Sequence, residues 1–184
     1  MSLQKSIILR SLIFIIFVTI ILYSLWSNTM HKEKTLNSFL EYIDQAKLEN
    51  LKLTIYYKSL FIFTHTPLTD NELIREDYEY KMTINGHRLK EYISLFDRIK
   101  STTLIHVENN TYLNSRLYYQ FETEKGQKVL TVSMWDKFNS IFVNGIEYNE
   151  NEQFCNIIMP FLPKDAAQEL SEYLQLIYHY SIKS

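Results

Sequence analysis

The side chains best suited to chemistry in this sequence are five histidines, and their spacing forms no local site. His65 directly follows one predicted strand and His106 lies in another, so the two could meet across strands as a metal-binding or acid–base pair, although surface or hydrogen-bonded histidines are commoner. The chain has one cysteine and no zinc-binding motif. We therefore predict no metal ligands. The histidines are His31, His65, His87, His106 and His179.

Nucleophilic and phosphate-binding sites are not indicated either. A catalytic serine or cysteine needs a positioned base, but G-x-S-x-G is absent, and Cys155 lies in an apolar helical stripe. With 3 glycines, the chain has no glycine-rich phosphate loop. The acidic pairs Glu76–Asp77 and Glu122–Glu124 have the groups that a hydrolase needs, but such pairs are usually solvated surface. We therefore predict a protein that is not an enzyme, with no catalytic residue and no cofactor.

A short aromatic segment from Trp135 to Phe138 is the candidate binding site. Its two rings flank a charged pair, Asp136 and Lys137, at the end of a predicted strand. Large aromatic side chains dominate interface energetics, so Trp135, Asp136 and Phe138 could form a rim that contacts a partner. The alternative is that both rings belong to the core, where large apolar rings usually lie.

The N-terminal segment from Ile7 to Trp26 is long and apolar enough to cross a lipid bilayer. As a helix it would span ~30 Å, and from Leu12 onward it carries no charge. Arg10 would reach the headgroups with its long side chain, while Tyr23 and Trp26 suit the opposite interface. The sequence therefore predicts a single-pass membrane anchor.

A cleaved secretory signal is the alternative interpretation of this segment. Against it, the apolar run is longer than usual, no Ala-x-Ala-like site follows, and Cys155 is too distant for lipidation. Lys5 and Arg10 lie on the N-terminal side of this segment, which the positive-inside rule places in the cytoplasm. The N-terminal tail is also too short to form a domain. We predict a tail and cell-membrane anchor at 1–30 and a periplasmic or extracellular domain at 31–184.

Beyond the anchor, the composition indicates one compact domain. Roughly 155 residues suit a single core, and 3 glycines with 3 prolines leave few long loops. Residues 31–184 carry 17 basic and 21 acidic side chains, without the basic excess of a nucleic-acid-binding protein. Because Cys155 is the only cysteine, we expect it to be buried and inert or to bridge two chains.

Apolar residues spaced by three and four predict amphipathic helices. Thr69 or Asp70 is placed to cap a short helical turn. Gly86 is expected to end a strand and lead directly into a helix, despite the Asn-Gly pair that often marks a hairpin. The longer helices are expected at 31–50, 87–100, 152–161 and after Pro163.

Alternating apolar and polar residues predict the strands. The clearest signals are two hairpins, one turning at Gly126 and one at Asn144-Gly145, the pair that a type I′ turn requires. The strands are expected at 51–57, 60–64, 78–84, 102–107, 116–122, 128–135, 140–143 and 146–148. The first two could instead be one bulged strand. We predict an α+β fold: an antiparallel meander sheet with helices covering one face.

Three functions from different classes are compatible with this architecture. The first is a binding domain that meets a protein partner at the outer face of the membrane, through a sheet edge or aromatic contacts. The second is an immunity-type protein that neutralises a toxin or other partner, for which the net charge of −4 on residues 31–184 would suit a basic target. The third is an envelope hydrolase, which needs polar groups that converge in a pocket. No nucleic-acid partner is expected.

Overall fold

The computed structural model contains two compact units, Met1–Lys34 and Thr35–Ser184. Within the first unit, residues 13–24 are helical. No helix in the described part of the chain combines the length and apolar character needed to cross a membrane. The predicted anchor extends beyond these residues on both sides. The structure describes residues 13–24, 39–43, 47–62, 66–100, 102, 104–105, 107, 114–135, 140–149 and 152–181.

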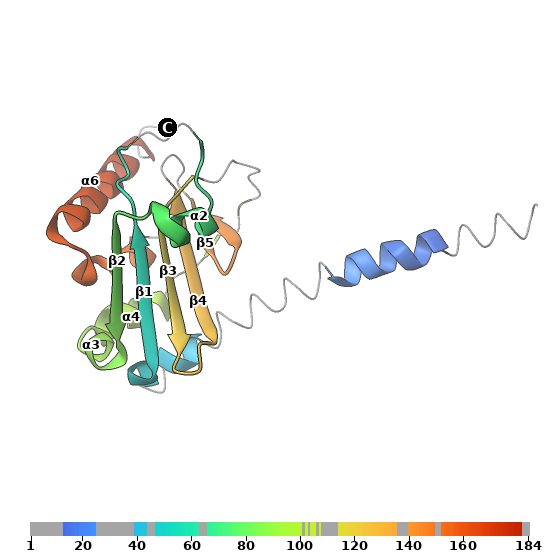
Figure 1. The fold of residues 1–184 in the computed structure, drawn as a ribbon, viewed down its shortest axis with the longest axis horizontal. Helices are drawn as coiled ribbons and strands as arrows, with labels where there is room; N and C mark the ends of the chain where they lie inside the picture. The colour runs from blue at the N-terminus through green and yellow to red at the C-terminus, as the bar shows by residue number, and fades with distance from the viewer. Residues whose placement is uncertain are drawn as a thin grey trace, which may run out of the picture. The chain divides into compact units, whose positions relative to one another are not determined.

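The second unit is built on a six-stranded sheet with the order β2-β1-β3-β4-β5-β6 (Figure 1). Every neighbouring pair of strands is antiparallel. The sheet and its helices confirm the predicted α+β fold, and β3 to β6 form the predicted meander. The strands are β1 (Leu51–Tyr57), β2 (Tyr80–Asn85), β3 (Ser115–Thr123), β4 (Lys128–Trp135), β5 (Ser140–Val143) and β6 (Ile146–Asn149).

Both predicted hairpin turns are confirmed by their backbone angles. Gly126, between β3 and β4, has a φ of 77°, while Asn144 and Gly145, between β5 and β6, have φ values of 52° and 75°. Glycine and asparagine adopt positive φ more readily than other residues. The side-chain oxygen of Asn144 also accepts a hydrogen bond from Thr131 N at 2.8 Å, which joins this turn to β4.

One face of the sheet, the inner face, packs against the helices to form the main core. Leu53, Tyr119 and Phe121 are fully buried on this face, and Phe121 lies 4.8 Å from the ring of Phe39. The described buried members of this core all lie between residues 39 and 174, so Thr35–Ser184 has a core of its own. The helical elements are η1 (Lys47–Asn50), α3 (Gly86–Lys90), α4 (Ile93–Lys100), α5 (Glu152–Asn156), η3 (Met159–Phe161) and α6 (Lys164–Ser181).

The chain passes from β2 directly into α3 at Gly86, as predicted. Asn85 caps this helix, because its side-chain oxygen accepts a hydrogen bond from Arg88 N at 3.2 Å. The predicted single helix at 87–100 is instead divided into α3 and α4. The backbone N–H groups of Tyr92 and Leu95 bond to carbonyls three residues earlier, and this tighter winding interrupts the α-helical ladder.

A short helical segment covers part of the opposite, outer face of the sheet. It consists of α2 (Asp70–Glu72) and η2 (Leu73–Asp77) and crosses in front of the sheet in Figure 1. Thr69 caps it with a reciprocal capping box involving Glu72, which confirms the predicted cap. Leu73 is fully buried in a small second core, where it packs with Tyr56 and Tyr118.

Two strand predictions are wrong in the residues that are described. Residues 60–62 form turn and coil rather than a strand, because β1 pairs with β2 on one edge and β3 on the other, so no edge is left for a third neighbour. The described residues of 102–107 are also not strand. Two backbone bonds, Val107 N to Glu147 O and Asn149 N to Ile105 O, nevertheless place this segment beside β6.

Candidate functional site

Of the predicted aromatic rim, the structure describes only the backbone of Trp135. The backbone of Trp135 ends β4 and pairs with Ser115 of β3. Asp136 and Phe138 lie outside the described residues, as do His65 and His106, so both groupings stay predictions. Trp135 is described only through its backbone, which leaves the choice between rim and core untested.

The structure shows the contacts of several other residues that the sequence analysis considered. Cys155 is buried, as expected, with 2% of its surface exposed and its Sγ 3.4 Å from Met134 Sδ. The carboxylate of Glu122 lies 2.9 Å from Lys52 Nζ. His87 is exposed at the start of α3, 3.9 Å from a carboxylate oxygen of Glu49. The side chains of Glu76 and Asp77 lie outside the described part of the chain.

A site that the sequence did not single out is the free side of strand β2, here called the β2 edge. β2 pairs with β1 and is the first strand in the sheet order, and no strand of the described residues lies on its other side. Its residues Lys81, Thr83 and Asn85 are exposed. An unpaired strand edge is a template for pairing with another extended chain.

The register of the sheet shows which residues turn their backbone polar groups toward this edge. Lys58 N, just after β1, donates to Arg116 O at 2.8 Å, and the pairing of β1 runs without a shift on both sides. Even-numbered residues of β1 therefore bond toward β3 and odd-numbered ones toward β2. By the same alternation, the N–H and C=O groups of Lys81 and Thr83 point away from β1, toward the β2 edge.

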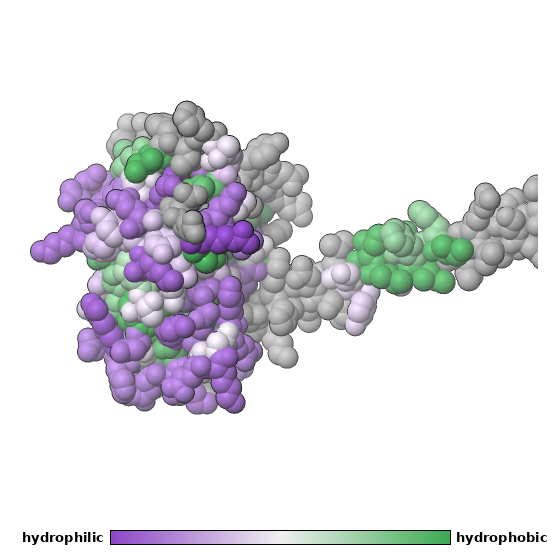
Figure 2. All heavy atoms as spheres, viewed as in Figure 1, coloured by the Kyte–Doolittle hydropathy of each residue, from purple (hydrophilic) through white to green (hydrophobic). Residues whose placement is uncertain are grey.

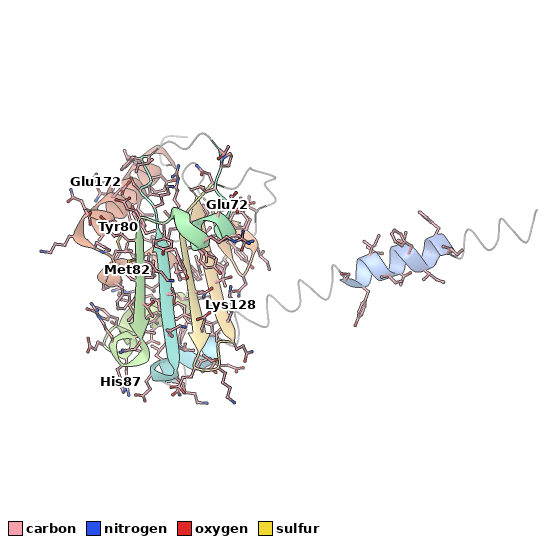
Figure 3. The ribbon with its side chains drawn as sticks, in the orientation of Figure 1. Glu72, Tyr80, Met82, His87, Lys128 and Glu172 are labelled. Atoms are coloured by element: carbon pink, nitrogen blue, oxygen red, sulfur yellow. The ribbon has the colours of Figure 1, made fainter. Side chains whose placement is uncertain are left out.

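Three carboxylates lie three and four residues apart along α6, on one face of that helix, and are here called the α6 carboxylates: Asp165, Glu169 and Glu172. The hydroxyl of Tyr80 donates to Asp165 at 2.5 Å, and that of Tyr57 donates to Glu169 at 2.9 Å. These bonds fasten α6 to β1 and β2. In Figure 3, Glu172, Tyr80 and Met82 are labelled along the edge of the sheet at which β2 and α6 appear.

Glu169 also helps to hold the loop that follows β1. Its second oxygen accepts hydrogen bonds from Ser59 Oγ at 2.5 Å and from Phe61 N at 3.1 Å. On the other side of the loop, the fully buried Arg116 donates from Nη2 to Ile62 O at 2.5 Å. The loop backbone is therefore fixed, while the side chains of Phe61 and Ile62 are 52% and 48% exposed.

The tyrosine–carboxylate bonds set the ionisation of this corner. The bond to Asp165 is the main reason that the pKa of Tyr80 rises to about 12, and the same bond lowers the pKa of Asp165. Burial, followed by the hydrogen bond to Glu169, raises the pKa of Tyr57 above its ordinary value. At neutral pH, Asp165 is therefore ionised and both tyrosines are neutral.

No carboxylate of this corner forms an ion pair with a lysine or arginine of the described residues. Glu79 and the α6 carboxylates accept from backbone, hydroxyl and amide donors. The ion pairs Lys52–Glu122, Glu49 with His87 and Lys90, and Asp97–Lys100 lie elsewhere. The corner is therefore a place where an added cation would be attracted.

The outer side of the β2 edge has the opposite charge. Lys81 Nζ lies 5.2 Å from the ring centroid of Tyr56 and 6.0 Å from that of Tyr78, as in cation–π contacts. The face of the sheet domain seen in Figure 2 is largely hydrophilic. The β2 edge is thus bordered by carboxylates on the α6 side and by a lysine on the outer side.

Comparison with protein-family models, curated proteins and solved structures finds no match to this chain. The site is therefore interpreted from its own geometry alone. Its elements offer backbone hydrogen bonding and charge, the means by which a sheet edge binds an extended segment.

Proposed function

We propose that this chain is a non-catalytic binding domain held at the outer face of a membrane, and that it binds a protein partner through the β2 edge. The observation that carries the binding role is the pairing of β2 on one side only, with Lys81 and Thr83 presenting backbone groups on the other. An extended partner segment would add as a seventh strand, with main-chain hydrogen bonds supplying affinity.

The membrane location is supported by the sequence from Ile7 to Trp26. The helix at 13–24 contains no charged residue, and its large side chains are exposed, with Phe14 at 68% and Phe17 at 62%. A helix with this surface gains free energy in lipid, at about 25 cal/mol per Å² of apolar area removed from water.

Cell fractionation tests the anchor. The full chain with a C-terminal tag should stay in the membrane pellet after alkaline carbonate extraction and should be released by detergent. The tag should be digested by protease added to intact spheroplasts. A protein found in the soluble fraction, or a tag protected from protease, would overturn the proposed location.

Site-directed photo-cross-linking in cells tests the binding surface. A benzophenone amino acid at Lys81 should give a discrete cross-linked partner, whereas the same probe at Lys125, in the exposed β3–β4 turn, should not. The partner band should be lost in Thr83→Pro, which removes an outward N–H, and retained in the matched control Thr83→Ala. A band that survives Thr83→Pro, or equal bands from both positions, would refute the β2 edge as the binding surface.

An immunity-type protein is the second candidate, and the uncompensated α6 carboxylates favour it because they suit a basic target. Expressing the chain in a sensitive strain and challenging it with basic toxins distinguishes the two. Protection that disappears with Asp165→Asn and Glu172→Gln would identify this more specific role. Unchanged sensitivity would leave binding as the better description.

A further inference from the structure

We propose that the β2 edge selects an extended segment with lysine or arginine at alternate positions, on the side that faces α6. This inference rests on the proposed binding role of the β2 edge and adds the chemistry of the partner. It follows from the two sides of that edge, which carry different charges.

An added strand would present its side chains alternately to the inner and outer sides of the sheet. The inner side of β2 faces the carboxylate of Asp165, because the hydroxyl of the inner-facing Tyr80 donates to it at 2.5 Å. A neighbouring strand would lie about 4.8 Å beyond β2, which keeps its inner-facing side chains near α6. Lysine and arginine have apolar stems that pack along a surface while the charged head extends to a carboxylate.

Charge separates the two sides of the added strand. Asp165 and Glu172 have no lysine or arginine partner among the described residues, so basic side chains on the inner side would gain ion pairs. On the outer side, Lys81 would repel a basic residue placed directly opposite it. The edge therefore favours basic residues at every second position and polar or acidic residues between them.

A second copy of this chain fits the edge poorly. If two β2 strands paired, each would place Tyr80, Met82 and Ile84 on its inner side, and none of these is basic. The α6 carboxylates of both copies would then approach one another without cations between them, which is unfavourable. The charge pattern thus points to a different polypeptide.

Peptide selection tests the proposal on the fragment 35–184, which contains every described residue of the main core. A phage library of random dodecapeptides is selected on this fragment, and the enriched peptides are synthesised and titrated. We expect lysine or arginine at alternate positions. Binding should be lost in Thr83→Pro, retained in Thr83→Ala, and weakened about five-fold by Asp165→Asn with Glu172→Gln, the size expected for two exposed ion pairs.

The peptide experiments distinguish failure of the proposed partner chemistry from failure of the β2 edge as the binding surface. Peptides that need the β2 edge but show no alternating basic residues, or bind the charge variant equally well, overturn the partner chemistry and leave the edge intact. Peptides that bind Thr83→Pro unchanged, or no enrichment at all, overturn both. Because Thr83→Pro could also unfold the domain, N-methylation of alternate peptide amides provides a second measurement. It should abolish binding in one of the two alternate patterns only, and equal loss in both patterns contradicts strand addition.

Discussion

Substitution of Gly86 by alanine tests how closely the start of α3 approaches η1. A Cβ at Gly86 would overlap the backbone O, C and Cα atoms of Glu49, all well inside the 3.0 Å that real Cβ contacts respect. Backbone atoms cannot move aside as a flexible side chain can, so the cost should reach the upper part of the ~1–3 kcal/mol range for overpacking. Alanine's better helix propensity recovers at most about 1 kcal/mol.

The expected net loss of about 2–3 kcal/mol would lower the Tm of this domain by roughly 4–12 °C. Urea unfolding of the fragment 35–184, followed by circular dichroism, measures it directly. Gly126→Ala is the matched control, because a Cβ there meets no atom within 4 Å and pays only for its φ of 77°, about 1–2 kcal/mol.

A second control separates the backbone of Glu49 from its side chain. Glu49→Ala removes exposed ion pairs with His87 and Lys90 and should cost under about 1 kcal/mol. The double substitution Gly86→Ala with Glu49→Ala should be no more stable than Gly86→Ala alone. If Gly86→Ala costs no more than Gly126→Ala, the close approach of α3 and η1 is refuted.

Two further predictions concern the tyrosines. Tyr119→Phe removes a buried hydroxyl that donates to Phe154 O at 2.7 Å, so it should cost about 1–2 kcal/mol of unfolding free energy, measured in urea. The control Tyr92→Phe, in a partly buried position, should cost less. Equal losses would contradict the role of this hydrogen bond. Tyr57 and Tyr119 have pKa values raised by burial, so they stay neutral in the folded state where the unfolded chain ionises. The contribution of these tyrosines to stability should therefore be constant up to about pH 10 and be lost above it. Tyr57→Phe should reduce the slope of stability against pH in that range; a slope unchanged by the substitution would show that Tyr57 does not contribute.

Local signals in the sequence were sufficient for the hairpins and the short cap. The turns at Gly126 and Asn144-Gly145 depend on residues that adopt positive φ, and the cap at Thr69 depends on a glutamate three residues later. Each is decided within a few residues, so the pattern and the structure agree. The buried stripe of α6, which includes Leu170, is similarly local because it follows from helical periodicity.

Features that depend on which strands become neighbours were not predictable in the same way. Alternation in 60–64 indicated a strand, but β1 already has two partners, and the loop instead bonds to Glu169 and Arg116. Arg116 itself begins a predicted strand, yet it is fully buried, and it lies where the register of β3 against β4 shifts, between Ser115 and Leu117. Such a shift reorients a side chain and leaves no mark on the alternation.

The two edges of this sheet differ in a way that bears on the proposed function. At β6, the backbone of Ile105 and Val107 occupies the edge with two hydrogen bonds. At β2, no described segment does so, and the exposed Lys81 lies over Tyr56 and Tyr78 rather than across the strand's free polar groups. Proteins commonly block such edges with bulges, proline, lysine or covering segments. β2 has an unshifted register and no proline, and its one lysine, Lys81, lies over tyrosine rings. A sheet that covers one edge and leaves the other regular and open is suited to accept a strand at the open side.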